Sequence, residues 1–81
     1  MDAGMKAFTL AQRINGITGQ EVRLSRLDGG GYRLHWQSNG DRDAEAATLP
    51  AMALSNRYGY SSRTRIVWME VDEPPDATGP S

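Results

Sequence analysis

The chain has 81 residues, a formal net charge of −1 and no cysteine. This length predicts one domain with a thin core. The absence of cysteine excludes disulfides, thiolate catalysis and iron–sulfur clusters, and the balanced charge differs from the basic stripe of a typical phosphate-binding domain. No window approaches the ~20 apolar residues of a membrane span, and the N-terminus lacks the pattern of a signal peptide. We therefore expect a cytoplasmic protein with no cofactor, no metal site and no membrane contact.

Arginine dominates the basic residues, because the chain has eight arginines and a single lysine, Lys6. Arginine makes forked and stacking contacts that lysine cannot make. The same bias is also typical of GC-rich genomes. It therefore favours a bacterial or phage source, and it makes the surface arginines candidates for contacts with a partner.

The N-terminal segment predicts one short helix. Residues 1–5 are mostly small or polar, and we expect them to be frayed. Apolar residues then recur at intervals of three and four over Phe8–Asn15, as in an amphipathic helix. Thr9 is a capping residue type for its start, and Gly16 is suited to end it in the left-handed conformation.

Two strands are predicted next. Alternation over Gln20–Leu27 indicates a strand with Val22 and Leu24 facing the core. A clearer alternation covers Tyr32–Gln37, and the Asn39-Gly40 pair after it is a strong hairpin signal. The side chains of the central strand separate into an inward set and an outward set: Tyr32, Leu34 and Trp36 inward; Arg33, His35 and Gln37 outward.

The second half of the chain predicts a strand, a helix and a strand. Arg42–Ala47 contains good helix formers, but the Asn-Gly signal requires a return strand, so a short edge strand is favoured here. Thr48 is expected to cap a helix that runs to about Tyr58, with Pro50 in its first turn. Arg63–Val71 reads as the last strand, apolar enough to be central or covered on both faces. Its alternate residues form two sets: Val67, Met69 and Val71 on one face, Ile66 and Trp68 on the other.

Together these elements predict a small α+β domain over residues 6–71. Their order is α-β-β-β-α-β, with an antiparallel meander sheet and the helices packed on one face of it. Residues 72–81 form an acidic tail with several prolines, which is expected to be disordered.

Residues that could support catalysis are few. His35 is the one side chain whose ordinary pKa lies near neutrality, and acid–base chemistry usually needs a second titrating partner. Asp41, Asp43 and Glu45 alternate but lack the spacing of a calcium loop. Asp28–Gly31 has the glycines of a phosphate loop without the lysine that such a loop uses, so it is interpreted as a turn. We therefore expect a protein that is not an enzyme.

The remaining polar and aromatic side chains favour recognition of a protein partner. Arginines pair with acidic groups, and aromatic residues fill pockets at interfaces. Whether Trp68 lies in the core or on the surface stays open at this stage. The candidate partner-binding residues are Arg23, Arg33, His35, Tyr60, Arg65 and Trp68.

One concrete form of this hypothesis is a phage-encoded inhibitor of a bacterial defence complex, similar to an anti-CRISPR protein. Such inhibitors are commonly short, poor in cysteine and free of motifs. The alternative is a nucleic-acid-binding accessory protein that uses its surface arginines, although the sequence shows no aromatic pair typical of RNA-binding sheets. A homodimer also stays open, because a second copy could complete a thin core.

Overall fold

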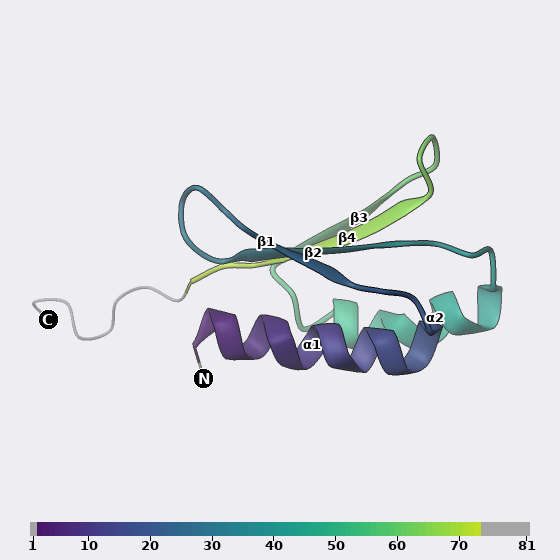
Figure 1. Ribbon diagram of the computed structural model, residues 1–81, viewed down its shortest axis with the longest axis horizontal. Helices are drawn as coiled ribbons and strands as arrows, with labels where there is room; N and C mark the ends of the chain where they lie inside the picture. Colours follow the sequence, from purple (N-terminus) through teal and green to yellow (C-terminus); the bar gives the residue numbers. More distant parts are fainter. Residues whose placement is uncertain (1, 74–81) are drawn as a thin grey trace, which may run out of the picture.

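The computed structural model describes residues 2–73 and shows two helices and a four-stranded antiparallel sheet in one small domain. Both helices lie on the same face of the sheet (Figure 1). The α+β class and the one-sided packing are therefore confirmed. The elements in chain order are α1 (Ala3–Thr18), β1 (Arg23–Arg26), β2 (Tyr32–Gln37), α2 (Arg42–Met52), β3 (Arg57–Ser61) and β4 (Ile66–Val71).

The observed order is α-β-β-α-β-β, which differs from the prediction in the second half of the chain. The strand order in the sheet is β1-β2-β4-β3, and all three pairings are antiparallel. The expected three-strand meander is thus wrong. The second neighbour of β2 is β4, which is distant in the sequence, and the sheet consists of two hairpins joined through this long-range pairing.

Helix α1 is twice as long as the predicted Phe8–Asn15. Its N-cap is Asp2, whose carboxylate accepts a 2.7 Å hydrogen bond from the backbone N–H of Met5. Gly16 lies inside the helix, and Gly19 ends it with a φ of 71°. Residues 3–5 are therefore helical, which corrects the expected frayed start, because Asp2 supplies the cap that the sequence analysis assigned to Thr9.

Helix α2 covers the segment for which a short edge strand was predicted. Asp41 caps it by accepting hydrogen bonds of 3.0 and 3.1 Å from the next turn. Thr48 is buried within the helix and does not start it, and Pro50 lies near the end. The Asn39-Gly40 pair forms a connection to the helix: Asn39 accepts a 2.9 Å hydrogen bond from the N–H of Asp41. The carboxylates of Asp41, Asp43 and Glu45, which would alternate along a strand, therefore lie at the N-terminus of α2. The helix dipole favours negative charge at this position.

Strand β3 lies where the sequence predicted the end of a helix and a loop. It pairs with β4 over its whole length, with Tyr58 opposite Met69 and Tyr60 opposite Val67. The turn between the two strands is closed by a 2.7 Å hydrogen bond that the N–H of Arg65 donates to the carbonyl of Ser61. The predicted strand Arg63–Val71 is confirmed from Ile66 onward.

The core lies between α1 and the inner face of β2 and β4. Tyr32 is partly buried at its margin, whereas Leu24, predicted to face the core, is 43% exposed on the edge strand β1. The assignment of Val67, Met69 and Val71 to one face is confirmed, because all three belong to this core. The buried side chains at its centre are Ala7, Leu10, Ile14, Leu34, Trp36, Met69 and Val71.

Neither described helix is long and apolar enough to span a membrane. Asp72 and Glu73 follow β4 without regular structure, and the rest of the predicted tail, residues 74–81, lies outside the described residues.

Candidate interaction face

No described helix covers the face of the sheet that points away from α1 and α2 (Figure 1). We call this surface the outer face. The strand register arranges its side chains in three rows across the sheet. The first row is Ser25, Arg33, Glu70 and Arg57; the second is Arg23, His35, Trp68 and Gly59; the third is Gln37, Ile66 and Ser61.

Trp68 lies in the middle row and is held from two sides. A Cβ atom at Gly59 would lie 2.6 Å from Cζ2 of the Trp68 ring, so the indole packs directly on this glycine. The guanidinium carbon of Arg33 lies 5.1 Å from the ring centre, within the range of a cation–π contact. Trp68 remains partly exposed. This answers the question left open by the sequence: the ring is a fixed aromatic anchor on the outer face and is not part of the core.

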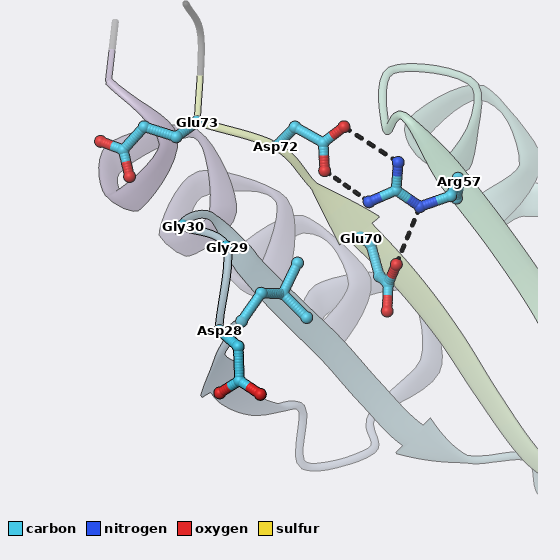
Figure 2. A pocket seen from close by; sticks show the side chains of 8 residues that line it. Asp28, Gly29, Gly30, Arg57, Glu70, Asp72 and Glu73 are labelled. Atoms are coloured by element: carbon cyan, nitrogen blue, oxygen red, sulfur yellow. Dashed lines mark hydrogen bonds and ion pairs between the residues drawn. The ribbon is translucent and has the colours of Figure 1, made fainter.

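Four charged residues form a chain of ion pairs beside this anchor. Glu70 accepts a 2.9 Å hydrogen bond from Nε of Arg33 and another of 2.9 Å from Nε of Arg57. Arg57 also donates to both carboxylate oxygens of Asp72, one of them at 2.9 Å (Figure 2). Glu70 is only 8% exposed although it is charged. Its two arginine partners compensate for the loss of water around the buried carboxylate.

These contacts shift the pKa values of the acids and of Arg57. The hydrogen bond from Arg57, followed by that from Arg33, lowers the pKa of Glu70 below its ordinary value. The hydrogen bond from Arg57 also lowers the pKa of Asp72, and Asp72 and then Glu70 raise the pKa of Arg57. The two carboxylates and Arg57 are therefore ionised at neutral pH.

A hollow beside this network is bounded by the turn between β1 and β2 and by the end of β4. Figure 2 shows that Asp28 and Glu73 direct their carboxylates away from Arg57, so the acids in this region do not converge on one point. Among residues 2–73, no group of three His, Cys, Asp or Glu side chains is placed to hold a metal ion. The arrangement is a structural ion-pair network.

His35 lies opposite both Arg23 and Trp68 in the strand register. Two shallow hollows adjoin its ring. One is lined in part by Arg33, Ile66 and Trp68, and the other in part by Arg23 and Ile66. Its Nδ1 atom is buried and has no hydrogen-bond partner. Buried polar atoms without a hydrogen-bond partner are exceptions in folded proteins.

The structure brings together four of the six predicted site residues. Arg23, Arg33, His35 and Trp68 are neighbours on the outer face. Tyr60 lies on the opposite, helix-facing side of β3, because its place in the strand alternation is opposite Val67. Arg65 lies in the turn after β3 and has a positive φ of 59°. Four of the six predicted residues therefore form one surface, whereas Tyr60 and Arg65 lie apart from it.

Three residues that shape this face were not predicted from the sequence: Glu70, Arg57 and Gly59. Glu70 stands within the last apolar strand, and a charged residue in such a position indicates a buried partner of opposite charge. Arg57 was placed in a helix, so its pairing with Glu70 could not be inferred. Gly59 lies between two tyrosines, where a glycine inside a strand signals the close approach of another group.

Comparisons with known proteins add no further evidence: no family model matches the chain, and neither a curated protein nor a solved structure matches it significantly. The assignment of this face as a site therefore depends on its geometry alone.

Proposed function

We propose that this protein acts without catalysis, by binding a protein partner through the outer face. The observation that carries the proposal is Trp68, a fixed aromatic ring that is partly exposed at the centre of an uncovered sheet face. Rigid tryptophans flanked by arginines are typical anchors of protein interfaces. A side chain of the partner would fill the hollow formed between Trp68, Ile66 and His35.

The charge on the face favours an acidic partner segment on the β1 side. The side chain of Arg23 is 71% exposed, and its ion pair with Glu21 is long, at 3.5 Å. A surface pair of this kind is weak and can be exchanged for a partner carboxylate at little cost. Arg33 and Arg57 already share the buried Glu70, so their role is to hold the face in shape.

We further propose the specific form suggested by the sequence, a phage-encoded inhibitor that binds a bacterial defence complex in the cytoplasm, as an anti-CRISPR protein does. The small size of the chain and its lack of cysteine support this form. An inhibitor of this type needs only a stable surface that blocks a larger complex, and the ion pairs of Glu70 with Arg33 and Arg57 support a stable outer face.

Affinity purification from a bacterial lysate tests the proposal. The wild-type protein is expected to recover a stoichiometric partner, and R23E and W68A are expected to lose it. R13E changes an exposed arginine on α1 in the same way and serves as the matched control, because α1 lies on the other side of the sheet. Recovery of no partner, or of the same partner by R23E and W68A, would refute the proposal.

A second candidate function has an observation of its own. His35 and Trp68 are directly opposite on adjacent strands, with Arg23 and Arg33 beside them. Aromatic rings flanked by arginines on an open sheet can stack the bases of single-stranded nucleic acid. The structure thus forms an aromatic pair that the sequence did not reveal. A fluorescent single-stranded oligonucleotide should then bind with an affinity that falls steeply with salt, whereas no binding at low salt would exclude this function.

A further inference from the structure

Strand β3 leaves one edge of the sheet open and carries two exposed aromatic residues. In the order β1-β2-β4-β3 its second edge has no partner strand among the described residues. Tyr58 is 56% exposed and Tyr60 54% exposed, although their cross-strand neighbours Met69 and Val67 are buried. Natural proteins usually protect such an edge with lysine, proline or a bulge. Over Arg57–Ser61 the edge has neither lysine nor proline, and its one charged residue, Arg57, is already paired with Glu70 and Asp72.

The sequence of β3 is close to a palindrome, Arg-Tyr-Gly-Tyr-Ser, centred on Gly59. If two copies pair antiparallel about Gly59, Tyr58 lies opposite the second copy's Tyr60, and this aromatic pair occurs twice. Arg57 then lies opposite the second copy's Ser61, so no like charges meet. Cross-strand aromatic pairs of this kind stabilise antiparallel sheets.

Other registers are less favourable. A shift of two residues in one direction places Arg57 opposite the second copy's Arg63, and like charges directly opposite destabilise a strand pair. The opposite shift leaves one Tyr58–Tyr58 pair and sets Tyr60 against Asn56. A shift of one residue would place the tyrosines of one copy on the wrong face. The opposite edge strand, β1, carries an arginine at each end, Arg23 and Arg26, which protects it from such pairing.

We propose that this protein forms a symmetric dimer by antiparallel pairing of β3 with β3 of a second copy, centred on Gly59. The result is a continuous eight-stranded sheet with all four helices on one side. The inference does not depend on the proposed function, but it extends it. The two Trp68 anchors would lie on one surface, three strand spacings or about 14 Å apart, so a partner could be engaged at two equivalent points.

Sedimentation or light scattering of the isolated protein over a range of concentrations gives the first test. The mass is expected to approach twice the 8.9 kDa of one chain as the concentration rises. Y60K should restore the monomer, because it places a lysine on the pairing edge. L24K makes the same type of change at an exposed residue of the other edge strand and should leave the dimer intact. Circular dichroism confirms that both variants are folded.

A cross-linking experiment tests the register. The chain has no cysteine, so every cross-link comes from the introduced residues. In the proposed register, Y58C of one copy faces Y60C of the other at about 5 Å between Cβ atoms. A mixture of the two single variants should therefore cross-link under mild oxidation more efficiently than either variant alone. A monomer at all concentrations, a dimer that persists in Y60K, or equal cross-linking of Y58C alone would overturn the proposal.

Discussion

Among the described glycines, Gly31 has the least room for a side chain. It has a φ of 90°, and a Cβ atom there would lie 2.3 Å from the carbonyl oxygen of Val71 and 3.0 Å from the Cα atom of Asp72. These are backbone atoms at the end of β4, so they cannot move aside as a flexible side chain would. We predict that G31A is strongly destabilising, because it separates the turn between β1 and β2 from the end of β4.

Two other glycines allow the effect of the positive φ on stability to be separated from the effect of the backbone clash. Gly40 has a φ of 82° but open space around it, and Gly29 has open space and no positive φ. A left-handed φ costs alanine about 1–2 kcal/mol, of which the lower entropy of the unfolded chain returns about 0.4–1 kcal/mol. The backbone clash at Gly31 adds about 1–3 kcal/mol, as other overpacked sites do. We therefore expect losses of about 3 kcal/mol for G31A and about 1 kcal/mol for G40A, and a gain of about 0.4–1 kcal/mol for G29A, where only the entropy of the unfolded chain changes.

Thermal unfolding followed by circular dichroism measures these differences. In a domain of this size each kcal/mol shifts Tm by about 4–8 °C, so G31A should melt about 12–24 °C below the wild type. The expected order of stability, from highest to lowest, is G29A, wild type, G40A and G31A. If G31A and G40A had the same Tm, the close approach of the turn to β4 would contribute nothing to the loss of stability, and the reasoning would be wrong.

Three further predictions address separate parts of the fold. G16A should raise the free energy of unfolding by about 0.5–1 kcal/mol, because Gly16 lies inside α1 with nothing within 4 Å of an added Cβ; a lower Tm would contradict this. R65G should raise Tm by a few degrees, because glycine adopts the positive φ of 59° without the strain that the Cβ atom of arginine causes there; an unchanged or lower Tm would contradict this. The pKa values of Glu70 and Asp72 are lowered in the folded protein, so as the pH falls the unfolded chain binds protons at a higher pH than the folded protein does. Their stabilisation is present above about pH 4.3, the ordinary value for Glu, and is lost as the pH falls through the folded values. Urea unfolding should therefore show wild type losing more stability than E70Q between pH 6 and pH 3, and parallel curves would refute the role of the network.

The outer face shows how far side-chain alternation alone can predict a site. The order of residues in β2 placed Arg33, His35 and Gln37 together, and the observed register with β1 puts Arg23 opposite His35. The position of Trp68 beside His35 depends on the pairing of β2 with β4, which joins residues 29 to 39 positions apart. No local pattern reports such a pairing, so the ring, its glycine platform and the buried Glu70 came only from the structure.

The sequence by itself determined the inner and outer residues of β2, the division of β4 into two sets of alternate residues, the glycine-rich turn before β2 and the α+β class. These follow from the alternation of side chains along a strand and from the special conformations of glycine, which are properties of the chain alone. Only the tertiary structure decided that Arg42–Met52 is a helix and that Arg57–Ser61 is a strand. Helix propensities differ by only a few tenths of a kcal/mol for most residues, so the local signals there were nearly balanced. The Asp41 cap and the packing of α2 against α1 favour the helix, and pairing with β4 favours the strand.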